Sequence, residues 1–449
     1  MTVACVRKAA RDWTNLQRER PVIVVQPRLW KAIKCLGRVL ALLPLLWALC
    51  HGLLIALGTA KAALALSLAG SSAVHISSRP SRKDILATAV TAVALRTLYV
   101  WFIGPIGSYF GSVWISWGSF LGVASLLTLA ARALTAGDTR RKIACQSFWG
   151  AIAFLYFWFI GAVAMQLTAR TIPLTLDRFL YVADSSLGFE PSFAAGSVLA
   201  GLPLLLRNLT WLQYEALMLA VAIVYAWQRM RSTDNSPKIL SATVSMAIVG
   251  FLLYYLYPAA GPVYGFGSLF PHRPPEALQL ALMPMPLDSA ARNAMPSLHM
   301  GMSLLVWWHS RGSRWVGRWL AGLFLLATAF STMAKGEHYL IDLIVAFPFA
   351  MAIQALWATV IPFTARARYL PLVKGTLMTF AWLALLRFGV HWLSVSPVIP
   401  WLLVSSTVVY SWATETKLAA VVHKIKQCSN RPEQFLAAGH AAMAKAAGS

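Results

Sequence analysis

Charged residues are scarce in this chain of 449 residues. Only 12% of the residues are Asp, Glu, Lys or Arg, whereas 58% are hydrophobic. A soluble globular protein carries about 25% charged residues and about 45–50% apolar ones. The composition therefore excludes soluble, disordered, collagen-like and coiled-coil classes and predicts a polytopic membrane protein.

Acidic residues are especially rare. The chain has 15 Asp and Glu against 39 Lys and Arg, a net charge of +24. In a soluble protein such an excess suggests nucleic acid. Here the basic residues are divided among many short loops, so a nucleic-acid partner is disfavoured. In a membrane protein the pattern reflects Lys and Arg placed in cytoplasmic loops.

Cysteine is also scarce. The five cysteines are an odd number without a CxxC pair, so the sequence predicts neither a disulfide framework nor a zinc site. We expect no metal and no cofactor.

Apolar stretches of about 20 residues, the length needed to cross the hydrocarbon core, predict an all-α membrane bundle with about eleven or twelve spans. The expected spans are residues 39–58, 60–75, 85–104, 112–131, 143–168, 208–228, 239–258, 297–311, 319–334, 339–362, 375–390 and 397–413. The organisation that follows is a basic cytoplasmic tail (1–38), accessory N-terminal helices (39–134), a core (143–362), a C-terminal helix pair (375–413) and a cytoplasmic tail (414–449).

Clusters of Lys and Arg recur after every second span, which orients the chain. One topology puts all of these clusters in the cytoplasm. Residues 169–207 and 259–296 then lie on the non-cytoplasmic side of a plasma or inner membrane. We interpret 169–207 as amphipathic half-helices on the membrane surface. Loops as long as 259–296 often form lids or binding loops.

Two histidines lie at the outer ends of predicted helices. His299 ends the sequence PSLH, which opens the span at 297–311, and His338 precedes the span at 339–362. Asp342 follows His338 by four residues, so the two side chains share a helical face. The carboxylate can hold Nδ1–H of the imidazole and leave Nε2 free to attack an electrophile. Asp342 also lies within an apolar stretch. An ionisable group is costly to place in the hydrocarbon of a membrane, so such a residue is usually functional.

The neighbouring residue types fit a phosphate ester, because phosphoryl transfer depends mainly on positioning and charge stabilisation. His338 is the candidate nucleophile and His299 the candidate acid for the leaving group. A helix that starts at residue 297 would point N–H groups at an anion. The candidate phosphate ligands are Ser297, Ser331, Lys335 and Arg292.

Each segment alone also has a structural interpretation. A histidine at a membrane interface is usually only solvated, and Pro–Ser before a helix is usually only a cap. Both segments occur on the same predicted face with Asp342 in register, which favours the functional interpretation.

The sequence PSLH, followed by S-x6-H-x3-D over residues 331–342, resembles the second and third signature motifs of the type 2 phosphatidic acid phosphatase superfamily. The wider stretch NAMPSLHMGMS … GEHYLIDL is most similar to the branch that contains inositol phosphorylceramide synthases. The resemblance covers residues 143–362 and implies a six-helix core.

The resemblance also implies roles for the candidate residues. His338 would form a phosphohistidine, Asp342 would orient it, and His299 would act first as acid and then as base for the acceptor. Ser297 and Ser331 would bind phosphate. The substrate would be a phospholipid or lipid phosphate, the acceptor water or an alcohol such as inositol, and the active site would face away from the cytoplasm.

Two features depart from the resembling motifs. The first motif, K-x6-RP, is absent, and its nearest substitute is the segment GPVYGFGSLFPHRPP with Arg273. Thr332 stands where the third motif has arginine. Lys335 and Arg292 are the proposed replacement cations.

Two classes of function remain. One is a membrane enzyme that hydrolyses a lipid phosphate or transfers a phosphate-containing headgroup. The other is a polytopic transporter or a non-catalytic lipid-binding membrane protein. A carrier predicts discontinuous midplane helices and inverted repeats, and the sequence shows neither.

Overall fold

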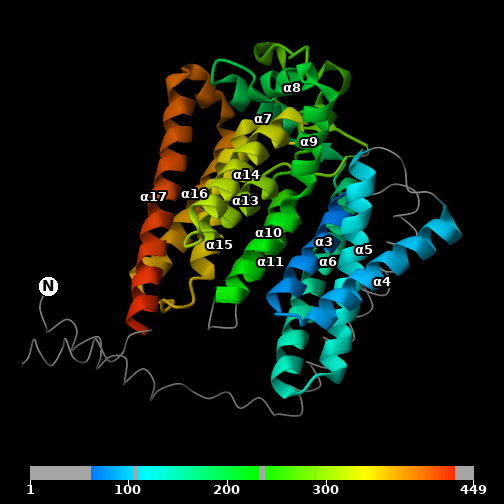
Figure 1. Cartoon of the computed structure of the whole chain (residues 1–449). Coiled ribbons are helices and arrows are strands. Elements are labelled where there is room, and N and C mark those ends of the chain that lie inside the picture. Colours follow the sequence, from blue (N-terminus) through cyan, green and yellow to red (C-terminus); the bar gives the residue numbers. More distant parts are fainter. Residues whose placement is uncertain (1–61, 105–109, 232–237, 289, 430–449) are drawn as a thin grey trace, which may run out of the picture. The chain divides into compact units, whose positions relative to one another are not determined.

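The computed structural model describes residues 62–104, 110–231, 238–288 and 290–429 (Figure 1). The expected span at 39–58, the basic segment 1–38 and the last twenty residues of the tail lie outside the described residues.

The predicted all-α fold is confirmed. The helices are α3 (Ala62–Ser77), α4 (Arg82–Ile103), α5 (Phe110–Thr135), α6 (Asp138–Thr171), α7 (Asp177–Ser185), α8 (Pro191–Gly201), α9 (Leu204–Glu215), α10 (Leu217–Arg231), α11 (Lys238–Leu256), α12 (Pro262–Gly265), α13 (Leu298–His309), α14 (Trp315–Ala334), α15 (Leu340–Leu356), α16 (Arg366–Phe388) and α17 (Val398–Ser429), with short 3-10 turns η1 (Gly267–Leu269), η2 (Ala277–Gln279) and η3 (Val390–Val395). Two short strands, β1 (Leu174–Thr175) and β2 (Met285–Pro286), pair antiparallel.

Five of the described helices are long and apolar enough to cross a membrane: α4, α5, α11, α14 and α16. The bent pair α9–α10 makes a sixth when it is counted as one span. This makes the chain an integral membrane protein. The number is below the expected eleven or twelve, partly because α13 and α15 are shorter than the spans predicted at 297–311 and 339–362.

Helix α15 is covered by neighbouring helices, and most of its side chains are buried. It packs against α11, α13, α16, α17 and α7. A helix that is apolar all round is expected where neighbours cover every face. The α16–α17 pair lies along it in orange and red in Figure 1. Helix α16 approaches α15 closely at Gly375, where an added Cβ would lie 2.6 Å from the carbonyl oxygen of Pro348.

The segments predicted to face outward form a cover of short helices and loop. Residues 169–207 contain the short helices α7 and α8, as predicted, while their place on the membrane surface stays a prediction. Aromatic rings join these helices to the loop after α12. Tyr181 lies 4.7 Å from Phe266, and Phe193 lies 5.2 Å from Phe270, between ring centroids.

Candidate active site

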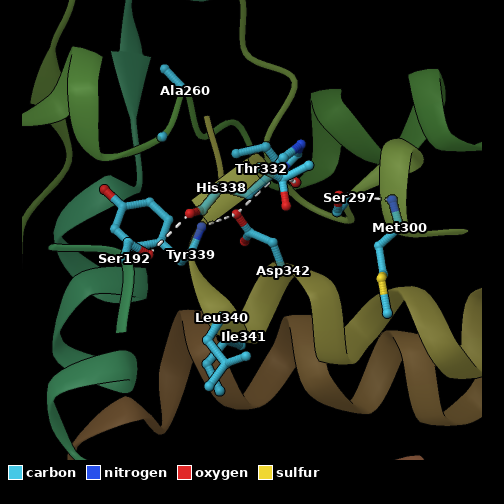
Figure 2. A network of polar contacts seen from close by, with 12 residues as sticks. Ser192, Ala260, Ser297, Met300, Thr332, His338, Tyr339, Leu340, Ile341 and Asp342 are labelled. Atoms are coloured by element: carbon cyan, nitrogen blue, oxygen red, sulfur yellow. Dashed lines mark hydrogen bonds and ion pairs between the residues drawn. The ribbon is translucent and has the colours of Figure 1, made fainter. Parts of the chain in front are cut away.

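His338 lies two residues before the start of α15, and its imidazole is only 1% exposed. Its Nδ1 atom lies 2.9 Å from the carbonyl oxygen of Ala294. The same atom lies 3.5 Å from Oδ2 of Asp342, and Figure 2 shows these two side chains. A carbonyl oxygen can only accept a hydrogen bond, so we assign the proton to Nδ1. With the proton on Nδ1, the lone pair of the imidazole lies on Nε2, the nitrogen that would attack phosphorus. The carbonyl is the nearer acceptor, so Asp342 would share with Ala294 the orienting role that the spacing predicts for Asp342 alone.

Asp342 also connects the two histidine segments. Its Oδ2 accepts a hydrogen bond of 2.9 Å from the backbone N–H of Tyr339, which caps α15. Its backbone carbonyl accepts a bond of 3.2 Å from the N–H of Ser297, at the start of α13. The residue therefore fixes the relative position of the segments that carry His299 and His338.

Two buried aspartates of α7 hold the start of α15, and the sequence analysis did not identify them. Asp184 accepts hydrogen bonds from the N–H groups of Leu340, at 2.8 Å, and Ile341, at 3.0 Å. Asp177 accepts a bond of 3.0 Å from the hydroxyl of Tyr339 and further bonds from backbone N–H groups at 260 and 261. Burial raises the pKa of both carboxyls, that of Asp184 well above its ordinary value. Their spacing of seven residues in DRFLYVADS, which puts both on one helical face, was the available signal.

On another side of His338, Ser192 of α8 fixes the backbone. Its hydroxyl donates a bond of 3.0 Å to the carbonyl oxygen of His338, as Figure 2 shows. The backbone and the ring of His338 are thus held by separate partners.

His299 lies in the first turn of α13 and comes close to His338. The centroids of the two imidazole rings are 6.1 Å apart. The other neighbour of His299 is Tyr214, whose ring is stacked on it with centroids 4.1 Å apart and an interplanar angle of 19°. The structure therefore brings together two histidines that are far apart in the sequence.

The two candidate serines are buried and have protein partners. Ser297 is the N-cap of α13, and its hydroxyl accepts a bond of 3.3 Å from the N–H of Met300 (Figure 2). Ser331 donates a bond of 2.9 Å to Oε1 of Gln213. Thr332 donates within its own helix, to the carbonyl oxygen of Thr328 at 2.8 Å.

Lys335 follows α14 and lies beside the histidine pair. Its ammonium group is 3.7 Å from Oε1 of Glu215 and 3.7 Å from the ring centroid of Tyr214, the ring that also stacks on His299. Burial lowers the pKa of the lysine, while the charges of Glu215 and Glu337 oppose that shift.

Arg292 is not positioned as predicted. The side chain is buried, and its Nε donates a bond of 2.9 Å to the carbonyl oxygen of Ile172. Its two terminal nitrogens bond the carbonyls of Ala290 and Leu287. The guanidinium thus ties the loop before α13 to the end of α6 and is occupied by backbone acceptors. Residues 266–284, between α12 and β2, form the cover loop. Arg273 lies exposed in this loop and, among the described residues, forms no hydrogen bond or ion pair with either histidine.

Comparison with protein families agrees with this geometry. Residues 178–356 match the PAP2 superfamily. The PAP2 match runs from the second residue of α7 to the end of α15, so it includes both histidine segments and Asp184, while Asp177 lies one residue before it. It supports a phosphatase or phosphotransferase type of function for this domain, acting on a lipid phosphate. It does not single out the inositol phosphorylceramide synthase branch. No curated protein and no solved structure matches the chain.

Proposed function

We propose that the PAP2 domain cleaves a phosphate ester of a membrane lipid through a phosphohistidine on His338. The observation that carries this proposal is the pairing of the two rings, 6.1 Å apart, with Nδ1 of His338 fixed by the carbonyl of Ala294. A nucleophile that is fixed in this way, with a second histidine beside it, is the arrangement expected for covalent catalysis.

The first step forms a bond between Nε2 of His338 and phosphorus and breaks the bond from phosphorus to the leaving oxygen. His299 gives its proton to that oxygen, which departs as an alcohol. Lys335 stabilises the charge on the phosphate oxygens. Ser297 and Ser331 are retained as candidate phosphate ligands, each of which must exchange its present partner to bind substrate.

The second step transfers the group from His338 to an acceptor. The acceptor hydroxyl gives its proton to His299 and attacks phosphorus, and the bond to Nε2 breaks. Water as acceptor makes the protein a lipid phosphatase, and an alcohol such as inositol makes it a headgroup transferase. The imidazole of His338 is 1% exposed, so substrate must move neighbouring side chains aside.

The test is an assay of the full chain in detergent with phosphorylated lipids. His338→Ala should reduce turnover to background, and His299→Ala and Asp342→Asn should each reduce it by about 10²–10⁴-fold, the range of general acid–base effects. His272→Ala, an exposed histidine of the cover loop, is the matched control and should keep full activity. Full activity of His338→Ala would rule out the mechanism.

A second assay distinguishes the acceptors. Alcohols, including inositol, are added while phosphate release and new lipid products are measured together. A transferase gives a new phosphate ester of the added alcohol at the expense of the product of transfer to water; the new ester is a monoester when the donor is a monoester and a diester when the donor is a diester. Phosphate release that no alcohol changes would identify a phosphatase.

A further inference from the structure

The span predicted at 208–228 is broken in the structure, next to the histidines. Helix α9 ends at Glu215, α10 begins at Leu217, and their axes are bent by 55°. The end of α9 is attached to α14 by Gln213, which donates a bond of 2.8 Å to the hydroxyl of Thr328 and accepts one from Ser331. The break therefore has a fixed position relative to the end of α14, where Lys335 lies.

The last two residues of α9 contact His299 and Lys335, two of the residues proposed to act in catalysis. Tyr214 stacks on His299, and Lys335 lies over the same ring. Glu215 pairs with the ammonium group of Lys335 at 3.7 Å, and the side chains of both are 20% exposed. The cation proposed to bind phosphate is thus already paired with a carboxylate.

A second carboxylate lies close to this pair. Glu337 follows Lys335 by two residues, and its Oε1 accepts a bond of 3.2 Å from the hydroxyl of Tyr264. Its charge acts on Lys335 together with that of Glu215. The positive charge of the lysine therefore faces two negative groups.

Among the described residues, no other cation offsets the negative charges of Glu215 and Glu337 at this site. Arg292 is bonded to backbone carbonyls, and Thr332 stands where the related motif has arginine. In the part of the chain that the structure describes, no other lysine or arginine forms a hydrogen bond, an ion pair or a cation–π contact with His299, His338 or Glu215. A phosphate that binds here meets a site with little net positive charge.

We propose that Glu215 is a specificity-determining residue that makes the site select singly charged phosphodiesters over doubly charged phosphate monoesters. The inference rests on the proposed function and names its substrate class. A phosphate must share Lys335 with Glu215 or displace it, and each additional negative charge on the substrate increases the repulsion from the carboxylates. Like-charge juxtaposition is a common means of rejecting a competing ligand.

A phosphodiester donor fits the two steps of the proposed reaction. Nε2 of His338 bonds to phosphorus, the ester bond to one alcohol breaks, and that alcohol leaves with the proton of His299. The second alcohol stays on the phosphoryl group and is carried to the acceptor. The donor is therefore a phospholipid with an esterified headgroup.

The first test compares kcat/KM for a lipid phosphodiester and for the corresponding lipid phosphate monoester. Glu215→Gln should lower the ratio of diester to monoester by about tenfold or more, mainly by raising the monoester value, since the change removes one full charge next to Lys335. Glu276→Gln removes an exposed carboxylate of the cover loop and should leave the ratio unchanged. An unchanged ratio in Glu215→Gln, or an equal fall for both substrates, would overturn the proposal.

The second test needs no turnover and so separates this inference from the proposed function. Acetylation of Lys335 by acetic anhydride is followed by peptide mass spectrometry in the presence of dimethyl phosphate or methyl phosphate at pH 7.5. Methyl phosphate is then mostly doubly charged, because its second pKa is about 6. Dimethyl phosphate should protect the wild-type lysine at the lower concentration, and Glu215→Gln should reverse the order.

Protection of the wild type by methyl phosphate at the lower concentration would contradict the charge selection, whether or not any lipid is turned over. Glu337→Gln provides a second variant that keeps the Glu215 pair and should shift the preference in the same direction by a smaller factor. If Glu215→Gln does not fold, Glu337→Gln decides, and no shift in it would overturn the proposal.

Discussion

At the scale of the residue, we expect Lys335 to set how substrate binding depends on pH. Burial lowers its pKa, although Glu215 and Glu337 oppose the shift. The ammonium group consequently loses its charge at a lower pH than an ordinary lysine does. Because that charge is proposed to hold phosphate, substrate affinity should fall as the pH rises through this lowered pKa.

Lys335→Arg is predicted to extend activity to higher pH. A guanidinium stays charged throughout the accessible range, so the alkaline limb of the kcat/KM profile should move upward while the acid limb stays in place. The measurement is a pH profile of both enzymes beside Lys374→Arg, a lysine that lies over Tyr410. A shared alkaline limb in the three proteins would show that Lys335 does not titrate in this range.

The residues of the site differ in how far a sequence can predict them. His338 and Asp342 lie four apart on one turn, so their proximity is a local property that the spacing gives directly. Arg292 depends on carbonyls at 172, 287 and 290, which come together only when the loop before α13 closes on the end of α6. The local sequence around Arg292, four positions before PSLH, would be the same whether its side chain pointed toward the site or away from it. The sequence alone therefore does not predict which way the arginine points.

At the scale of the element, α15 depends on polar side chains at both ends. Asp184 holds the first N–H groups, and Arg368 holds the last carbonyls. The central residues of the helix are apolar and buried, so the polar contacts to its backbone lie at its ends. The two ends therefore set where His338 lies.

Asp184→Ala is predicted to destabilise the protein and to reduce turnover. Loss of a capping carboxylate costs about 0.5–2 kcal/mol, and the freed N–H groups immediately follow His338. Thermal unfolding in detergent measures the first effect, and kcat at full substrate saturation measures the second. Asp138→Asn, an exposed acid in the first turn of α6, should change the stability by less than about 0.5 kcal/mol. Unaltered stability of Asp184→Ala would show that the cap is dispensable.

Arg368→Ala is predicted to destabilise the protein by freeing the carbonyl groups at the C-terminal end of α15. The guanidinium donates to the carbonyl oxygens of Ala355, Leu356 and Ile361 at 3.1, 2.6 and 2.9 Å. Loss of hydrogen bonds from a charged donor costs about 1.5–3 kcal/mol. Arg368→Lys should restore little, because an ammonium group lacks the planar fork. The unfolding midpoint of each variant is compared with that of Arg366→Ala, an exposed neighbour, and equal midpoints would contradict the role.

The break between α9 and α10 is an element that hydropathy does not predict. Residues 208–228 are apolar enough to be interpreted as one helix, and Tyr214 and Glu215 then fall within it. In the structure the turn at Ala216 places them against His299 and Lys335. Packing of α9 against α14 and of α10 against α3 and α13 accompanies the bend, and these contacts join parts of the chain that are far apart in the sequence.

At the scale of the whole molecule, charge and hydropathy predicted the class and the all-α architecture. The sequence could not give the number of full spans, because helix length depends on where neighbours and caps end each helix. Helix α13 ends at His309, whose ring nitrogens bond Gln228 of α10 and Gln354 of α15. His309 and its two partners thus come from three separate parts of the chain.

The orientation in the membrane remains a prediction of the charge pattern. In a cysteine-free background, His272→Cys in the cover loop and Ser313→Cys in the turn before α14 should react with a membrane-impermeant thiol reagent from opposite sides. The cover loop should be labelled from the non-cytoplasmic side in intact cells. Labelling of both positions from one side would contradict the topology.

The central claim is that His338 carries the phosphoryl group during turnover. The most direct test uses a lipid labelled at phosphorus, an alkaline quench during steady-state turnover, and mapping of the labelled peptide. We predict acid-labile, alkali-stable label on the peptide that contains His338, and none in His338→Ala. Turnover with no labelled peptide, or with the label on another residue, would contradict the account.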